Sequence, residues 1–428
     1  VSGGPVMLVG CGQSAGKSAS NYYEDALKRF NQARYDAARV QLRNALAQDR
    51  SHLPAQLLLG RVHLKLNEPE AAEKYLESAW KNGADPEQVL PPMAEAMLSQ
   101  GRSRELIETL GLRRLHGPDE GLYYLVRGDA YLAMGDAAAA ELDYELARRL
   151  RPEDEDPLYG LARVAMQRNR PGVAEDFVDL ILEEAPDNAA AWYLKGELRR
   201  SKQDLEGALK AYGESLSLKP GSVASQNARA AALFQLGRDA EALEQVKATL
   251  AEAPNDPEAK YIKALVLVRR AEIDDAREVM REALRFLDSL PPELVARRPR
   301  AQFLLGIGHF AEGNFDKARV YLEPYVQKDP SNVRALKFLG IIYLEQGDPE
   351  DAMNVLVRAS RLAENDVQVH ALLGEAYSRE QYYSLATESY ERAAAAAPDP
   401  LRYKTDIALS KLAAGDREGA LSDLEEGF

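Results

Sequence analysis

The feature that most constrains the fold of this chain is an internal period of 34 residues. Proline marks this period at Pro152, Pro186, Pro220, Pro254, Pro330 and Pro398. The first four prolines are 34 residues apart, and the last two follow at intervals of 76 and 68 residues. A small residue and, twelve residues later, an alanine keep the same period, as at Gly128 and Ala140. A constant period of this length indicates an array in which each unit packs only on its neighbours.

Each unit has the pattern of two amphipathic helices, and residues 121–154 illustrate it. Apolar side chains form one stripe in each half of this unit, at Leu122, Leu125, Tyr131 and Leu132 and then at Leu142, Leu146 and Leu150. This spacing is that of a helix with one buried face. Gly135 lies between the halves, where it permits a tight turn, and the proline at a unit boundary ends one helix or opens the next. One helix pair cannot bury its apolar face alone, so the units must stack on one another.

The period divides the chain after its first 18 residues into twelve units with one interruption. Units 1–8 are predicted at residues 19–287 and units 9–12 at residues 299–428, where the last unit stops six residues short. Residues 288–298 between them contain an insertion of eight residues, which ends in Arg297 and Arg298. We interpret the insertion as a joint between the two arrays. A longer loop and a basic contact on an acidic protein are the alternatives.

This pattern resembles the tetratricopeptide repeat (TPR), a 34-residue helix–turn–helix unit with small residues and a terminal proline at these places. The fourth unit carries the resemblance at Gly128, Tyr131, Gly135, Ala140, Tyr144, Ala147 and Pro152. The third unit departs most, with Leu106 in place of alanine and Pro91-Pro92 inside its first helix. The resemblance implies an all-α solenoid, a right-handed superhelix of about twelve units. A coiled coil is the structural alternative, but turns in every half unit are incompatible with sustained heptads.

The N-terminal residues do not follow the repeat. The run Val6–Gly10 is short and apolar and ends in a small residue, and Cys11, the one cysteine of the chain, follows it. This resembles the bacterial lipobox, which implies that residues 1–10 are the remnant of a signal peptide and that Cys11 carries the lipid. Residues 11–18 then form a flexible tether, because small polar residues make flexible linkers. No positively charged segment precedes the run, and a disordered tail with an incidental cysteine is the alternative.

The residues Gly16-Lys17-Ser18 also look like the end of a phosphate-binding loop. Such a loop needs a glycine five residues before its Gly-Lys, so that backbone N–H groups can wrap the phosphates. Cys11 occupies that position, and no alternating strand–helix pattern follows. The sequence therefore predicts no nucleotide binding.

Composition excludes several further classes of function. The chain has 68 Asp and Glu against 54 Lys and Arg, a formal net charge of −14, which argues against nucleic acid as a partner. Its five histidines are scattered and its single cysteine lies in the leader, so neither a metal site nor a Cys/His or Ser/His/Asp catalytic set can be assigned. No apolar run approaches the roughly 20 residues of a membrane span. We expect no enzyme activity, no metal and no cofactor, and membrane contact through the lipid anchor alone.

In TPR proteins the first helix of each unit lines the concave surface, with unit positions 2, 5, 9 and 12 facing inward. Carried over to this chain, the resemblance predicts a concave binding groove at Tyr159, Arg163, Tyr193, Glu197, Asn227, Tyr261 and Phe303. Aromatic side chains there offer a large contact area to an extended peptide or a sugar ring. The alternative is that the aromatics pack inside the superhelix and the charges pair between adjacent units. No unit combines Lys at position 5 with Asn at position 9, so the carboxylate clamp of chaperone adaptors is not expected.

A closer resemblance rests on the third unit, at Asn82–Pro86, Val89–Pro91, Ala94, Gly101 and Leu106. Together with the lipobox and the long array, these residues resemble the TPR lipoproteins of PEP-CTERM/exosortase systems. The resemblance implies a non-enzymatic scaffold for protein partners of an envelope export complex, associated with exopolysaccharide. Gly12 after the cysteine implies the periplasmic face of the outer membrane. A module that binds polysaccharide directly and a cytoplasmic TPR adaptor are the alternatives.

Overall fold

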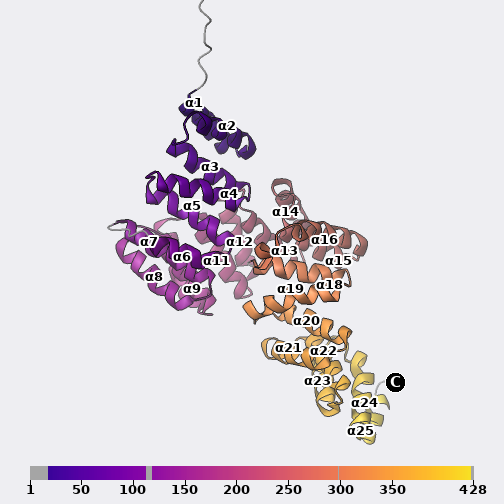
Figure 1. The fold of residues 1–428 in the computed structure, drawn as a ribbon. Helices are drawn as coiled ribbons and strands as arrows, with labels where there is room; N and C mark the ends of the chain where they lie inside the picture. Colours follow the sequence, from indigo (N-terminus) through magenta and orange to yellow (C-terminus); the bar gives the residue numbers. More distant parts are fainter. Residues whose placement is uncertain (1–17, 112–117, 297, 426–428) are drawn as a thin grey trace, which may run out of the picture. The chain divides into compact units, whose positions relative to one another are not determined.

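The computed structural model describes residues 18–111, 118–296 and 298–425, and these residues contain helices and no strand (Figure 1). The first helices of successive pairs are α1 (Ala19–Asn31), α3 (Leu53–Lys65), α5 (Pro86–Ser99), α7 (Pro118–Ala133), α9 (Asp156–Gln167), α11 (Ala189–Ser201), α13 (Val223–Gln235), α15 (Pro257–Arg269), α18 (Pro299–Ala311), α20 (Val333–Gln346), α22 (Val367–Arg379) and α24 (Lys404–Ala413). The second helices are α2 (Tyr35–Gln48), α4 (Pro69–Lys81), α6 (Ser103–Gly111), α8 (Ala137–Leu150), α10 (Pro171–Glu184), α12 (Leu205–Leu218), α14 (Asp239–Glu252), α16 (Ile273–Asp288), α19 (Phe315–Lys328), α21 (Pro349–Leu362), α23 (Tyr383–Ala396) and α25 (Arg417–Glu425). Two short helices complete the set, α17 (Pro292–Ala296) and the 3-10 helix η1 (Pro400–Tyr403).

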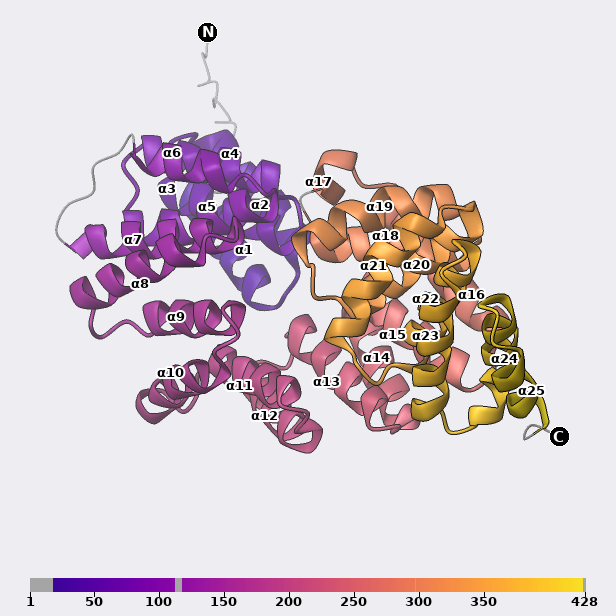
Figure 2. The same ribbon diagram turned by 90° about the horizontal axis from the view of Figure 1, so that it is seen from below.

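The helices form two compact units that divide after Leu194, within α11. Inside each unit, contacts join the two helices of a pair and link one pair to the next, as α7 contacts α8 and α8 contacts α9. Figures 1 and 2 both show α7, α8 and α9 side by side, as their contacts require. First helices of neighbouring pairs also touch, as α5 touches α7 and α7 touches α9. The core is therefore a series of local clusters between neighbours, and the predicted all-α solenoid of helix pairs is confirmed.

Short side chains and glycines set the ends of these helices. Ser18 caps α1, because its hydroxyl accepts a hydrogen bond from the backbone N–H of Asn21 at 3.2 Å. Asp136 caps α8 in the same way through the N–H of Ala139 at 3.0 Å. Gly135 has a φ of +83°, so the turn between α7 and α8 uses the left-handed backbone conformation that glycine adopts without strain.

The recurring small residue makes room for one large side chain from the second helix of its own pair. Gly60 faces Leu76, Gly128 faces Tyr144, Gly196 faces Tyr212, Gly306 faces Leu322, Gly340 faces Leu356 and Gly374 faces Tyr390. In each pair the two residues are 16 positions apart. A Cβ atom added at Gly196 would lie 2.3 Å from a ring carbon of Tyr212, which is far inside van der Waals contact. The small residues of the period therefore leave space into which a Leu or Tyr side chain of the partner helix packs.

The third repeat of the 34-residue array still forms a helix pair, α5 and α6, despite its departures from the sequence pattern. Pro91 and Pro92 lie inside α5, which continues to Ser99. Leu106, in place of the expected alanine, is fully buried in the same core cluster as Ala94 and Leu110. A proline has no N–H, so these two leave the carbonyls of Glu87 and Gln88 without the donor that an α-helix normally provides.

The insertion contains α17, whose Val295 is buried in a core cluster with Leu287 and Leu304. Arg300, just after it, forms an ion pair with Glu258. A role of the insertion as a joint stays a prediction, and Arg297 lies outside the described residues, as do Cys11 and the predicted signal-peptide remnant.

Candidate functional site

A cavity of about 480 Å³ lies in the first compact unit, on the face formed by the first helices α5, α7 and α9. Its lining includes most of the positions that the repeat pattern predicts to face inward in these three helices. The apolar part of the lining consists of Pro91, Ala94, Leu98, Leu122, Leu125, Val126, Ala133 and Tyr159. Tyr159 and Arg163, two residues of the predicted groove, therefore line one common cavity.

The polar part of this lining is mainly acidic. Five carboxylates face two guanidinium groups there: Glu87, Glu95, Asp129, Asp154 and Asp156 with Arg151 and Arg163. Arg151 pairs with Glu87 and, at 2.8 Å, with Asp154. Arg163 pairs with Asp129, with Nη1 and Oδ1 3.2 Å apart.

Asp129 is held by Tyr144, and the recurring glycines in turn hold the ring of this tyrosine in place. Tyr144 is fully buried, and Cβ atoms added at Gly128 or Gly160 would lie 2.8 or 2.4 Å from its ring. Its hydroxyl donates a hydrogen bond of 2.8 Å to Asp129 Oδ1, the same atom that Arg163 contacts. Burial raises the pKa of Asp129 above its ordinary value, although Arg163 and Tyr144 both act to lower it.

The same combination of glycine, acid and tyrosine recurs in the second compact unit, at residues 196–212. Glu197 follows Gly196, and the hydroxyl of Tyr212 donates to Glu197 Oε1 at 2.5 Å. Burial acts to raise the pKa of Glu197, but the hydrogen bonds and charge of Arg200 outweigh it and leave that pKa below its ordinary value. We did not predict this arrangement from the sequence, yet its signal is simple: an acidic residue directly after the small residue, and a tyrosine fifteen positions later.

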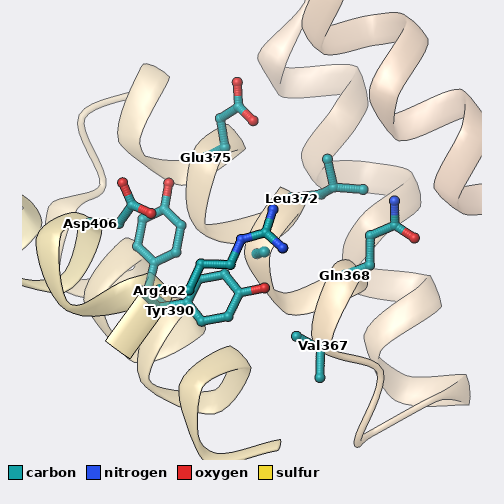
Figure 3. Close-up of a pocket in the computed structure, with 9 residues that line it drawn as sticks. Val367, Gln368, Leu372, Glu375, Tyr390, Arg402 and Asp406 are labelled. Carbon is teal, nitrogen blue, oxygen red and sulfur yellow. The ribbon is translucent and has the colours of Figure 1, made fainter. Parts of the chain in front are cut away.

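A third copy of this pattern, Gly374-Glu375 with Tyr390, borders a cavity of about 630 Å³ in the second compact unit. Figure 3 shows Glu375, Arg402 and Asp406 around this cavity, with the apolar Val367 and Leu372 on α22. Burial raises the pKa of Tyr390 to about 12. Burial also raises the pKa of Asp406, and the negative charge of Glu375 adds to that effect.

The first unit holds a second cavity, of about 420 Å³, between α1, α3 and α5. It is lined by Tyr23, Leu57 and Arg61, which occupy unit positions 5, 5 and 9, and by Gln88 of α5. Because α5 borders both cavities, the hollowed face continues from one pair of repeats to the next.

The remaining predicted groove residues lie on α11, α13, α15 and α18. Tyr193 is half-buried on α11. Asn227 is only 2% exposed, and its amide donates to Asp256 Oδ1 at 2.9 Å. Its binding role, and that of the other predicted groove residues, stays a prediction.

Tyr261 and Phe303 are brought together in the second unit. Their rings meet edge to face with centroids 6.3 Å apart, and Phe303 also packs against Tyr325 at 5.2 Å. The hydroxyl of Tyr261 accepts a hydrogen bond of 2.6 Å from Arg334 Nη1. These aromatics thus pack on one another, and their polar atom already has a partner.

In residues 18–111, 118–296 and 298–425 no group of three or more His, Cys, Asp or Glu is arranged to hold a metal ion. Among the helices of the described part, none is long and apolar enough to cross a membrane.

Comparison with solved structures supports the fold. A crystal structure of the APC/C hetero-tetramer Cut9–Hcn1 is similar with a TM-score of 0.50 and 16% identity, covering 95% of this chain and 92% of that chain. Yeast Tom70 is less similar, with a TM-score of 0.42 and 14% identity over 94% of this chain and 96% of that one. No curated protein sequence matches the chain.

Comparison with family models identifies the repeat. A tetratricopeptide repeat model matches residues 29–90, 131–198, 200–266 and 309–376, and a second one matches residues 369–402. Together these ranges cover more than half of the chain. The chain therefore belongs to the tetratricopeptide repeat family, and its helix pairs form a scaffold suited to protein–protein interaction.

Proposed function

We propose that this protein is a non-enzymatic scaffold that holds a protein partner of an envelope export or assembly complex on the hollowed face of its first helices. Lipidation of Cys11 anchors it to the periplasmic face of the outer membrane. The observation that carries the scaffold role is the cavity between α5, α7 and α9, in which apolar side chains from three successive repeats surround a polar rim. Concave sites of this size and mixed lining are typical of binding sites.

The dimensions of this face suit an extended chain. Neighbouring helices pack about 8–10 Å apart, so three first helices span about 20 Å. An extended peptide rises about 3.3 Å per residue and crosses that span with about six residues. Its alternate side chains point to the cavity, where Leu122, Leu125 and Tyr159 offer apolar contact.

The membrane anchor and the association with exopolysaccharide export rest on the sequence. The run Val6–Gly10 before Cys11 supports the anchor, and the third unit supports the resemblance to the PEP-CTERM-associated lipoproteins. Within that setting a protein partner is favoured over the polysaccharide itself. An acidic polymer would be repelled by a net charge of −14 and by the acidic rim of the cavity.

Fatty-acid labelling and cell fractionation of the complete gene product test the anchor. We expect label and membrane association in the wild type and in a Ser14→Ala control, which changes the same tether, and loss of both in Cys11→Ala. Unlabelled protein that stays in the cytoplasm in all three strains would discard the anchor and the envelope assignment and leave a cytoplasmic adaptor.

A further inference from the structure

We infer that the cavity between α5, α7 and α9 binds an extended, apolar segment of a partner protein that carries a lysine or arginine side chain, and that Glu95 and Asp156 receive this cation. The inference rests on the proposed scaffold function and names the chemistry of its partner. It concerns only the first compact unit.

The first step is the unequal charge of the lining. Five carboxylates and two guanidinium groups leave an excess of three negative charges around one cavity. Both arginines are already engaged, Arg163 with Asp129 and Arg151 with Glu87 and Asp154. The cavity therefore has no guanidinium left for its other acids.

The second step is that two carboxylates remain without a cation. Neither Glu95 nor Asp156 forms an ion pair with any residue in the described ranges. They come from α5 and α9, the two first helices that contact α7, and both side chains reach the solvent. A lysine or arginine that enters the cavity finds carboxylates there that have no cation of the chain to pair with.

The third step concerns the backbone of α5. Pro91 supplies no N–H to the carbonyl of Glu87, and both residues line the cavity. Pro92 does the same to the carbonyl of Gln88, which borders the adjoining cavity. Glu87 belongs to the lining of the cavity, so we expect its carbonyl to accept a hydrogen bond from a peptide N–H group or a cationic side chain that enters there.

The electrostatics of Asp156 agree with this assignment. Burial raises the pKa of Asp156 above its ordinary value, and the negative charges of Asp154 and Asp129 raise it further. Bringing a cation close to these groups removes part of that repulsion. An acidic segment or an acidic polymer would increase it.

The equivalent acids of the second unit are already neutralised by the chain itself. Glu258 pairs with Arg300, and Glu197 pairs with Arg200 at 2.7 Å. At these two positions the acids of the first unit remain open, whereas those of the second unit are paired within the chain.

The test uses the purified full chain and terminally blocked, fluorescent octapeptides of sequence Gly-Leu-Pro-X-Leu-Ser-Leu-Gly, where X is Arg, Lys, Gln or Glu. Fluorescence anisotropy at two salt concentrations gives the affinities. We expect the Arg and Lys peptides to bind about tenfold more tightly than the Gln peptide, with the Glu peptide weakest, and we expect added salt to reduce the difference.

Variants assign the effect to the cavity. Glu95→Gln with Asp156→Asn should abolish the preference for Arg and Lys, and Glu95→Lys should improve binding of the Glu peptide. The matched control is Glu183→Gln, an exposed acid on α10 that lies outside the cavity, and it should leave every affinity unchanged. Circular dichroism checks that each variant keeps its helices.

The outcomes separate this inference from the proposed function. If the peptides bind equally whatever X is, and Tyr159→Ala abolishes binding, the groove of the scaffold stands and the basic partner is refuted. If the basic peptides keep their advantage in the Glu95→Gln, Asp156→Asn variant, the assignment to these two acids is wrong. If no peptide binds, the inference is overturned, whereas the Cys11 labelling still decides the anchor. Preferential binding of dextran sulfate, a polyanion, would also overturn it.

Discussion

Gly196 gives the sharpest test of how the repeats pack, because its replacement by alanine adds a single methyl group. That methyl would lie 2.3, 2.5 and 2.9 Å from the Cε1, Cδ1 and Cζ atoms of the Tyr212 ring. Tyr212 is fully buried, and its hydroxyl is tied to Glu197 at 2.5 Å, so the rigid ring cannot move aside without losing that hydrogen bond.

The expected loss follows from two opposing effects. Overpacking of a core costs about 1–3 kcal/mol, and we place this site in the upper half of that range because an aromatic ring cannot change shape. Alanine in place of glycine inside a helix stabilises by about 0.5–1 kcal/mol. The net expectation for Gly196→Ala is a decrease of about 1–2 kcal/mol in the free energy of unfolding.

Gly213 provides the matched control in the partner helix α12. A Cβ atom there meets nothing within 4 Å, so Gly213→Ala keeps the helix gain without the clash and should stabilise by about 0.5–1 kcal/mol. The double variant Gly196→Ala, Tyr212→Val recreates the pair Ala230 and Val246, which occupies the equivalent positions of the next unit. It should be more stable than the sum of its two single variants predicts, by about 1 kcal/mol.

Urea unfolding followed by circular dichroism gives the global effect, and hydrogen exchange of the α11 and α12 amides gives the local one. The local measurement is needed because repeat arrays open unit by unit. Equal stabilisation by Gly196→Ala and Gly213→Ala, or strict additivity in the double variant, would refute the idea that the recurring glycine leaves the space that the facing ring fills.

Two further predictions concern the cavity of the first unit. Pro91→Ala restores the N–H that bonds the carbonyl of Glu87, so thermal unfolding should show a gain of about 1–2 kcal/mol in the free energy of unfolding. The affinity for the Arg octapeptide should fall at the same time. A gain in both stability and affinity would contradict the role given to that carbonyl. The affinity for the Arg octapeptide should also fall as the pH is lowered, and the fall should begin above the ordinary range for aspartate, because the pKa values of Asp129 and Asp156 are raised and only the ionised carboxylates attract the cation. Without peptide the same two groups affect the folding stability, and in the opposite direction. Their pKa values are higher in the folded state, so their ionised forms destabilise the fold at neutral pH. The protein therefore becomes more stable as the pH falls through the folded-state pKa. Calorimetric titration from pH 7 to pH 4.5 measures the affinity, and urea unfolding over the same range measures the stability. An affinity that does not change over this range would contradict the assignment.

The sequence by itself determined the repeat and the fold class. The 34-residue period, the two apolar stripes of each unit and the proline at the boundaries are local patterns, and local patterns decide where helices begin and end. The small residues at Gly128 and Gly196 correctly indicated close packing between helices. Tyr159 and Arg163, two positions that the TPR resemblance places on the concave face, line one cavity, and their binding role stays a prediction.

Only the tertiary structure decided what those positions do. The fit of Tyr144 between Gly128 and Gly160 joins residues of two repeats, and a period within one repeat cannot reveal it. Whether a charge is free depends on its spatial neighbours: Arg163 is engaged by Asp129, whereas Glu95 and Asp156 have no ion pair in the described part of the chain. Asn227, predicted from its position to face the groove, is 2% exposed, and its amide bonds to Asp256, the residue that caps α15 of the next helix pair. Positions repeat along the sequence, but the partners of each side chain come from several neighbouring helices, and those helices differ from unit to unit.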